Sequence, residues 1–233
     1  MNRTSTAAEE YQPTAVTSWT LAQLDRMAVI VSDFCRPTTR AALLEAAEAI
    51  VAERGIDALS VRTVADGVGA STRAVYSVFG SKEALVRGLA HRAFELLMQA
   101  VDAIPETGDP GLDLSQAMVR GFRRFALEHR DLFRLAFVWS PVQPNQEVLD
   151  MSAEALTRLV HRIERAQSAG VLPSGNVNEA TAELHAMCLG LATLELCGML
   201  PNDQGERVWV DSVGDLLAGM QKRASAAGEL GVR

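Results

Sequence analysis

The stretch from residue 60 to residue 85 constrains the fold most, because two short apolar patterns meet there at a glycine. Ser60 precedes a segment with apolar residues at helical spacing, and its hydroxyl can accept a hydrogen bond from the free N–H groups of a first helical turn. Gly69 admits the positive φ that a sharp turn between helices needs. Ser71 can then cap a second helix over residues 72–79. The stretch therefore predicts two short helices joined by a tight turn, followed by the start of a third.

The second of these helices would have two different faces. Val75 and Phe79 lie four residues apart and point to one side. The other side carries Thr72, Arg73, Tyr76 and Ser77. A short helix with a buried apolar edge and such a polar outer face suits insertion into the major groove of DNA. A purely structural role stays open, because helix–glycine–helix turns are common in helical proteins and Tyr76 could be a half-buried core residue.

The order of residues in this stretch resembles the DNA-binding domain of the tetracycline-repressor (TetR) family. That family usually shows Ile-Ala-x-x-Ala-Gly-Val-Ser, then Leu-Tyr-x-His-Phe-x-Ser-Lys-Glu-x-Leu. This chain has in their place Val64-Ala65-x-x-Val68-Gly69-x-Ser71, then Val75-Tyr76-x-x-Phe79-x-Ser81-Lys82-Glu83-x-Leu85. The resemblance covers residues 38 to about 94. Relative to the family pattern, Val68 replaces a smaller Ala and Ala70 replaces a larger Val. Val78 stands where His is common, so no phosphate contact is expected from Val78.

The exposed face and the resemblance together predict a module that binds double-stranded DNA. Base edges would be read by Arg73, Thr72 and Ser77. Phosphates would be held by Tyr76, Arg62, Thr63 and Lys82. The full predicted DNA-binding set is Ser60, Arg62, Thr63, Ser71, Thr72, Arg73, Ala74, Tyr76, Ser77 and Lys82.

The local distribution of charge supports a DNA-binding module, although the net charge of the whole chain does not. The net charge of the 233 residues is −7, which by itself speaks against a nucleic-acid partner. Residues 36–92, however, carry eight Lys or Arg and six Asp or Glu, a net charge of +2, so the rest of the chain carries −9. This asymmetry would orient the small module toward DNA, and its weak excess of positive charge predicts modest non-specific affinity.

Composition excludes several other classes of protein. Apolar residues make up 48% of the chain and charged residues 22%, as in ordinary soluble globular proteins. The cysteines Cys35, Cys188 and Cys197 form no close pair, which argues against a disulfide framework or zinc site and fits a reducing cytoplasm. The N-terminus does not read as a signal peptide, and no apolar run approaches the ~18 residues of a membrane span, so no membrane partner is expected.

The sequence also lacks the motifs of common enzymes. It has no Gly-x-Ser-x-Gly elbow, no phosphate-binding glycine loop and no His-Glu-x-x-His pair. Gly67 and Gly69 lie between two predicted helices and not after a strand, so they are no dinucleotide fingerprint. The four His are scattered, and His185 with Cys188 is interpreted as packing within an apolar helix. We expect no enzymatic activity, no cofactor and no bound metal.

The whole chain is predicted to be all-α, with no segment of strand periodicity of useful length. It divides into an N-terminal extension with an extra helix (1–37), a helix-turn-helix domain (38–94), a larger ligand-binding and dimerisation domain (95–223) and a flexible tail (224–233). The extra helix, at residues 18–34, would cover an apolar groove, or alternatively place an N-terminal arm near the DNA minor groove. Further helices are expected at 81–101, 112–128, 132–139, 146–169, 180–200 and 207–220.

Residues 121–220 resemble a regulatory domain found in some members of the TetR family. The similarity rests on two short motifs, Phe125-Ala126-x-x-His129-x-x-Leu132-Phe133 and Gly190-Leu191-x-x-Leu194-Glu195. The Trp and His usually found before that glycine are replaced by His185 and Leu189, so no role of theirs is carried over.

The expected helix at 180–200 is apolar on nearly all sides and needs cover on two of them. One side can face its own domain, and the other can face a second copy, where small residues permit close approach. The resemblance implies a four-helix dimer interface, formed by Ala182, Ala186, Gly190, Gly198, Trp209, Val213 and Leu217. Such a homodimer would present two recognition helices about 34–36 Å apart to a near-palindromic operator. The alternative is a buried helix inside a monomer.

A cavity in the larger domain is expected to bind a small lipophilic effector, because flexible methionines beside aromatic rings suit varied apolar ligands. The predicted lining is Met98, Phe122, Phe125, Phe137, Trp139, Met151, Met187 and Leu191. Core packing is the alternative for each of them. The sequence thus predicts a homodimeric, ligand-released repressor, and its rival is a helical ligand-binding module that has lost DNA binding.

Overall fold

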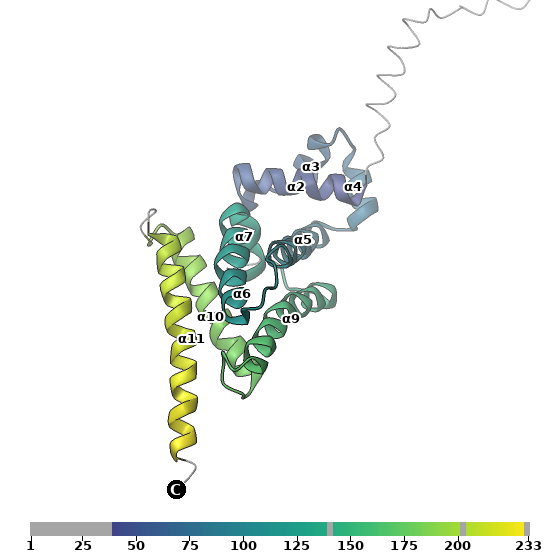
Figure 1. The fold of residues 1–233 in the computed structure, drawn as a ribbon. Coiled ribbons are helices and arrows are strands. Elements are labelled where there is room, and N and C mark those ends of the chain that lie inside the picture. Colours follow the sequence, from purple (N-terminus) through teal and green to yellow (C-terminus); the bar gives the residue numbers. More distant parts are fainter. Residues whose placement is uncertain (1–38, 139–141, 201–203, 231–233) are drawn as a thin grey trace, which may run out of the picture. The chain divides into compact units, whose positions relative to one another are not determined.

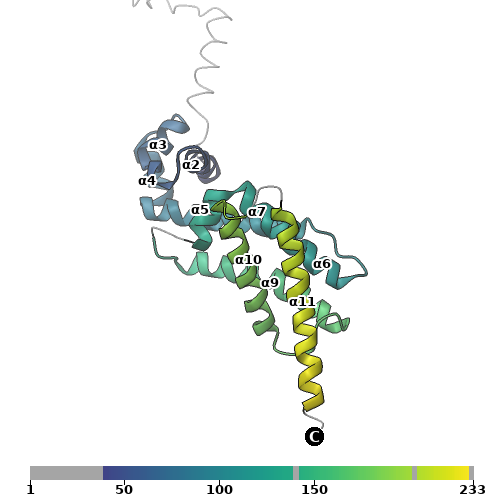
Figure 2. The same cartoon turned by 90° about the vertical axis from the view of Figure 1, so that its left-hand side faces the viewer.

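The computed structural model describes residues 39–138, 142–200 and 204–230, and every regular element in those ranges is helical (Figure 1, Figure 2). The elements are α2 (Arg40–Arg54), η1 (Ile56–Ala58), α3 (Val61–Gly67), α4 (Thr72–Phe79), α5 (Lys82–Asp102), α6 (Pro110–Gln116), η2 (Ala117–Phe122), α7 (Arg123–Glu128), α8 (Arg130–Phe133), η3 (Arg134–Val138), α9 (Gln146–Ser168), α10 (Val177–Leu196) and α11 (Gly205–Leu230). The predicted all-α class is confirmed for these ranges. The helix expected at 18–34 and the predicted ligand residue Trp139 lie outside the described residues.

Local hydrogen bonds fix the start of α3, and a glycine fixes the turn that follows it. Ser60 Oγ accepts the N–H of Thr63 at 3.0 Å, and Thr63 Oγ1 accepts the N–H of Ser60 at 3.0 Å, so α3 begins with a closed capping box. Gly69, with φ of 66°, then turns the chain sharply. This positive φ is the conformation for which the sequence required a glycine. The predicted helix–turn–helix is therefore present at the expected residues.

Helix α5 runs from this module into the rest of the described chain, and α2 of the module also packs against α8. It starts after Ser81, whose Oγ accepts the N–H of Ala84 at 3.1 Å. It contacts α2 and α4, and further on it contacts α9 and η2. Gly88 permits the close approach of the module, because a Cβ there would stand 3.0 Å from the Leu44 side chain and 3.3 Å from the Phe79 ring. The boundary predicted near Phe94 therefore falls inside a continuous helix.

The loop after α5 is held by a buried carboxylate. Asp113 is 2% exposed, and the backbone N–H and hydroxyl of Thr107 both donate to it at 2.7 Å. Arg165 of α9 adds an ion pair at 3.2 Å. The hydrogen bond from the Thr107 hydroxyl is the main reason why the pKa of Asp113 lies below its usual value. These bonds fix the end of α5 against α6 and α9.

Helices α10 and α11 lie side by side and pack against the core (Figure 1, Figure 2). Glu195 of α10 joins them to α7 through one buried carboxylate. The guanidinium of Arg123 donates to Glu195 at 2.8 and 3.0 Å, and the indole N–H of Trp209 donates to it at 2.9 Å. The side chains of Arg123 and Glu195 are 17% and 12% exposed, so this contact lies largely out of water.

Some helix bounds differ from those expected from the sequence. The stretch expected as a simple α-helix at 112–128 contains the π-helical segment η2, and the one expected at 132–139 contains the π-helical segment η3. Helix α10 stops at Leu196 because Gly198 adopts a φ of 71° soon afterwards. Helix α11 continues to Leu230, past the end expected near Met220, through an alanine-rich stretch that favours helix. The flexibility expected for residues 224–233 stays a prediction.

Candidate nucleic-acid interface and internal cavity

The structure exposes the polar face of α4. Ser71 Oγ accepts the N–H of Ala74 at 3.2 Å, which fixes the start of this helix. Val75, at 1% exposure, anchors its other side in the core. On the outer side Thr72, Arg73 and Ser77 are exposed, and the ring of Tyr76 is 50% exposed. A half-exposed tyrosine on a rigid, capped helix is free to contact a partner, so the interpretation of Tyr76 as a core residue is not supported.

The other predicted DNA-binding residues divide into two groups. Arg62 and Lys82 are exposed on α3 and at the first position of α5. Their cations, with that of Arg73, can bind an anionic partner. Ser60 and Thr63, in contrast, are half-buried. Their hydroxyls bond to each other, and the Thr63 hydroxyl also donates to the carbonyl oxygen of Ala58. The cap predicted for Ser60 is present, and Thr63 completes it. Contact of these two residues with DNA stays a prediction. Ala74 is half-buried and Ser71 serves as a cap.

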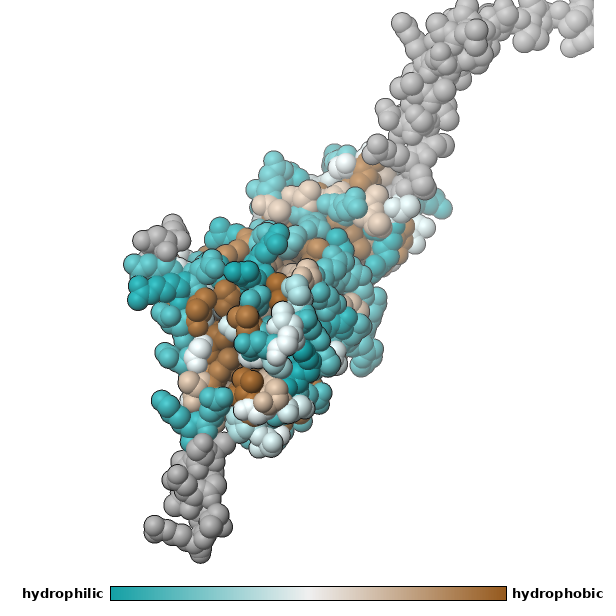
Figure 3. Space-filling model, viewed as in Figure 1, coloured by the Kyte–Doolittle hydropathy of each residue, from teal (hydrophilic) through white to brown (hydrophobic). Residues whose placement is uncertain are grey.

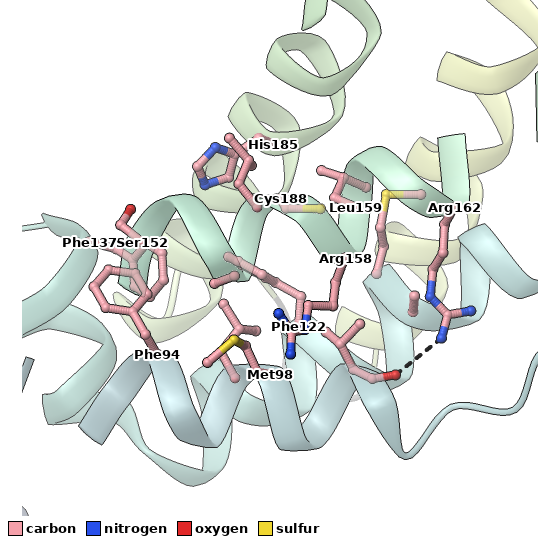
Figure 4. Close-up of a pocket in the computed structure, with 16 residues that line it drawn as sticks. Phe94, Met98, Phe122, Phe137, Ser152, Arg158, Leu159, Arg162, His185 and Cys188 are labelled. Atoms are coloured by element: carbon pink, nitrogen blue, oxygen red, sulfur yellow. Dashed lines mark hydrogen bonds between the residues drawn. The ribbon is translucent and has the colours of Figure 1, made fainter. Parts of the chain in front are cut away.

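A small internal cavity lies in the larger part of the structure, lined by residues of α5, η2, η3, α9 and α10 (Figure 4). Its free space is about 80 Å³. Helix α5 contributes Phe94, Leu97, Met98 and Val101. An engineered apolar cavity that binds benzene measures roughly 150 Å³, so this cavity must expand before it can hold an effector of that size or larger.

The cavity includes only part of the predicted ligand set. Met98, Phe122 and Phe137 line it, as predicted. The predicted residues that do not line it are Phe125, Met151, Met187 and Leu191. Phe125 is instead 1% exposed and packs between His129, Phe133 and Phe137. Met151 packs in a small cluster beside Val148. An apolar pattern shows which residues avoid water, but it does not show which of them border a gap.

Sequence reasoning missed the polar residues of the cavity. Its lining includes Ser152, Arg158, Arg162, His185 and Cys188. His185 and Cys188 were interpreted as packing, and the structure adds that both border this cavity. Arg162 is 5% exposed, and its nitrogens donate to backbone oxygens of Val101 and Ile104 at 3.2 and 2.9 Å. The available sequence signal was a row of three arginines at helical spacing on α9, namely Arg158, Arg162 and Arg165.

Burial keeps two of these groups uncharged at neutral pH. It lowers the pKa of His185 below its ordinary value, because the imidazolium form is poorly solvated there. It raises the pKa of the Cys188 thiol to about 12, so no thiolate forms near pH 7. The cavity therefore offers a neutral imidazole and a neutral thiol, and its charge comes from the two arginines.

The lowered pKa of His185 predicts a pH-dependent stability. The unfolded chain protonates His185 near pH 6.5, whereas the folded chain resists protonation to lower pH. The unfolded state therefore binds more protons, so the free energy of unfolding should fall as the pH decreases below about 6.5. Urea titrations of the native chain and of His185→Gln at pH 8, 6.5 and 5.5 measure this. The difference between the two proteins should change below pH 6.5, and parallel pH profiles would contradict the assignment.

Five of the seven predicted dimer residues reach the surface: three on α10, one just after its end and one on α11. Ala182, Ala186, Gly190 and Gly198 are exposed, and Leu217 of α11 is half-buried. Large apolar side chains beside them are also exposed, namely Leu194 at 40%, Met199 at 71% and Val210 at 48%. Figure 3 shows apolar surface gathered over α10 and α11. This is an unusually apolar face for one subunit.

Two of the predicted dimer residues are placed elsewhere. Trp209 and Val213 are both 0% exposed, so in this structure they belong to the subunit's own core. Trp209 packs near Phe122, with 6.4 Å between ring centroids, and bonds to Glu195. Sequence reasoning assigned them to the wrong side of α11, because both sides of that helix carry apolar residues.

These features define a helix-turn-helix protein whose larger helical domain is joined to the module by the shared helix α5 and by the packing of α2 on α8. Family comparison agrees: residues 43–89 match the model for bacterial regulatory proteins of the tetR family, and residues 115–216 match a tetracyclin repressor-like C-terminal domain. The chain belongs to the TetR family. None of the helices in the described ranges is both long and apolar enough to cross a membrane.

Similar proteins include the HTH-type transcriptional repressor KstR2 of Mycobacterium tuberculosis, 36% identical over 91 residues. That alignment covers 39% of this chain and 44% of KstR2, so less than half of the relative's length is matched. A solved protein of unknown function from Rhodococcus sp. RHA1 is 25% identical, with a TM-score of 0.71 over 80% of this chain and 99% of that one. The TetR family regulator PfmR of Thermus thermophilus is 24% identical, with a TM-score of 0.55 over 75% and 96% of the two chains, and shows the same fold.

Proposed function

We propose that this protein is a DNA-binding transcriptional repressor of the bacterial cytoplasm, active as a homodimer and released from its operator by a small lipophilic effector. The observation that carries the proposal is the exposed polar face of α4, formed by Thr72, Arg73, Tyr76 and Ser77 on a helix capped at both ends. The similarity to the repressor KstR2 points the same way.

The structure refines how this surface would contact DNA. Arg73, with Thr72 and Ser77, faces outward and can reach base edges in the major groove. Tyr76, Arg62 and Lys82 surround it and can hold phosphates. The Thr63 hydroxyl is used in the α3 cap and is left out of the phosphate set.

A second copy would place two such surfaces on one operator. The exposed apolar face of α10 and α11 (Figure 3), to which α10 contributes the small exposed residues Ala186 and Gly190, can pack closely on its own twofold copy. The two α4 helices would then need a spacing of about 34–36 Å, or a multiple, to enter successive major grooves of a near-palindromic site.

Effector release would act through α5. This helix begins with Lys82 beside the DNA-contacting surface, and further along it lines the cavity with Phe94, Leu97 and Met98. Because the free space of the cavity is only about 80 Å³, a larger effector would widen it, and α5 and α9 are two of the helices that would move apart. A ligand that binds only the parted state shifts the equilibrium toward it. The spacing of the two α4 helices would change with it.

A gel-shift titration tests the proposal. The full chain is mixed with DNA from upstream of its own gene and with shuffled DNA of equal length. We expect a salt-sensitive complex that prefers the upstream fragment by about a thousandfold or more. Absence of any selective complex would favour the rival function, a helical ligand-binding module without DNA binding.

Two substitutions separate base reading from phosphate binding. Arg73→Ala should weaken operator binding by about 1–3 kcal/mol and relax the sequence preference. Lys82→Ala should weaken binding to all DNA and lower the slope of log K against log salt by roughly one. Binding to operator and random DNA at several salt concentrations measures both effects. Equal losses on random DNA for the two variants would contradict this division of roles.

A further inference from the structure

The charge of the internal cavity is one-sided. Its lining includes Arg158 and Arg162 and no Asp or Glu. The other titratable groups that border it, His185 and Cys188, are neutral near pH 7 for the reasons of burial given above. A mainly apolar space with cationic groups and no lining carboxylate favours an anion over a cation of the same size.

Arg162 is the more deeply placed of the two cations. It is 5% exposed, and its nitrogens donate to backbone oxygens of Asp113, Val101 and Ile104 at 3.4, 3.2 and 2.9 Å. A guanidinium has five N–H donors and stays charged at any physiological pH. These three bonds therefore leave donors available, and the charge itself is matched only by carbonyl dipoles.

Ion pairing distinguishes Arg162 from its neighbours on α9. Arg158 pairs with Asp102 and Glu154 at 3.5 and 3.2 Å. Arg165 pairs with Glu106 and Asp113, both at 3.2 Å. Within the described ranges Arg162 has no carboxylate oxygen within 4.0 Å. Three carbonyl oxygens, two of them at the C-terminal end of α5, compensate the charge of Arg162 in part, and a carboxylate would compensate it more fully.

The two ends of the cavity differ, and the second lining cation, Arg158, lies between them (Figure 4). Figure 4 shows Arg162 at one end, Phe94 and Phe137 at the other, and Met98 and Leu159 between them. The two aromatic rings lie 5.1 Å apart, edge to face. A molecule that fills this space would meet a guanidinium at one end and aromatic rings at the other.

We infer that the cavity binds an amphipathic carboxylate, with its head at Arg162 and its apolar body toward Phe94 and Phe137. A carboxylate matches the planar fork of a guanidinium better than a hydroxyl does, and its charge remains compensated when water is excluded. The inference rests on the proposed function only in calling this molecule the effector. Binding itself can be tested without DNA.

The position of Arg162 also supplies a way to transmit binding. The same guanidinium holds the carbonyls of Val101, in the last turn of α5, and of Ile104 just beyond it. A carboxylate head that binds the donors left free draws the guanidinium toward itself and weakens its bonds to these carbonyls. Binding then loosens the end of α5, whose first residue is Lys82 on the DNA-contacting side.

The first experiment needs no mutation. The full-length chain is titrated calorimetrically, in the absence of DNA, with 4-phenylbutyrate, 4-phenylbutan-1-ol and 4-phenylbutylamine, and then with decanoate, decan-1-ol and decylamine. In at least one series the carboxylate should bind about 10- to 100-fold more tightly than the alcohol, and the amine should bind most weakly. The inference is wrong if an alcohol or amine binds as tightly as its carboxylate. It is equally wrong if neither carboxylate reaches a Kd below about 1 mM.

A matched pair of variants assigns the preference to one side chain. Arg162→Gln should reduce the ratio of carboxylate to alcohol affinity to within about twofold, while alcohol binding is retained. Arg165→Gln makes the same chemical change three residues along α9, at a side chain outside the lining, and should keep the ratio. An unchanged ratio in Arg162→Gln would overturn the assignment. If that variant does not fold, Arg158→Gln decides: because Arg158 is the other cation of the lining, a ratio kept in that variant supports Arg162 as the partner of the carboxylate, and a ratio lost there would overturn the assignment.

These outcomes are separable from those of the proposed function. Loss of operator binding in the gel shift would leave the calorimetric preference for carboxylates untouched. Absence of that preference would leave the DNA-binding proposal standing and would remove only the class of effector.

Discussion

Replacing Glu195 with alanine is expected to lower the free energy of unfolding by about 3 kcal/mol. The side chain is 12% exposed and accepts hydrogen bonds from Arg123 and Trp209, so one carboxylate joins α7, α10 and α11. Alanine leaves a largely buried guanidinium and an indole N–H without this partner. Glu206, 3.8 Å from Arg123, offsets part of the loss, which places the estimate at the lower end for a broken buried pair.

Thermal unfolding at a fixed protein concentration measures this effect. For a chain of this size, 3 kcal/mol corresponds to a fall in Tm of roughly 6–12 °C. Glu195→Gln keeps an oxygen that can accept from Trp209 but loses the charge, so its Tm should lie between those of the native chain and the alanine variant. A fall of only about 1–2 °C for alanine would show that the network adds little stability.

An exposed ion pair on the neighbouring helix provides the control. Arg124 and Glu128 of α7 lie 2.7 Å apart, closer than the buried pair, but their side chains are 69% and 52% exposed. Glu128→Ala should therefore cost less than about 0.5 kcal/mol. The comparison separates the effect of burial from the effect of distance.

The parts of the fold that depend on neighbouring residues were predictable from the sequence. Helix α4 occupies residues 72–79 as expected, because Ser71 at its start and Gly80 at its end act locally. The serine caps at Ser60 and Ser81 were found for the same reason. The start of α9 at Gln146 also agrees with the expected bound. The exposed face of α4 followed from the spacing of Val75 and Phe79 alone.

The parts that depend on which helix packs against which were harder to predict. Trp209 and Leu217 lie on the same helix, and the sequence could not show that Trp209 would turn inward to bond Glu195. The cavity was missed in part for the same reason: Arg162 and Met98 border it from two helices far apart in sequence. The π-helical segments η2 and η3 carry no sequence mark that distinguishes them from α-helix.

Replacing Ala186 with arginine is expected to give a folded monomer that has lost most of its operator affinity. Ala186 is exposed on α10, among Gly190, Leu194 and Val210. An arginine there adds bulk and a charge to a face that, in the proposed dimer, meets its own twofold copy. Two like charges would then be buried close together, which disfavours association strongly.

Operator affinity is lost because a monomer no longer links two α4 helices that bind the two half-sites. A dimer binds its second half-site at a high effective concentration, which commonly raises overall affinity by about 10²–10⁴-fold. Size-exclusion chromatography with light scattering measures the oligomeric state of the variant, and a gel shift on the operator measures its affinity for DNA.

Ala153→Arg, the same change at an exposed site of α9, is the control and should leave a dimer of native affinity. Because Ala186 has no role inside the subunit core, a native-like Tm for the monomeric variant would tie the lost affinity to the interface. A dimeric Ala186→Arg with full operator binding would place the interface on another face.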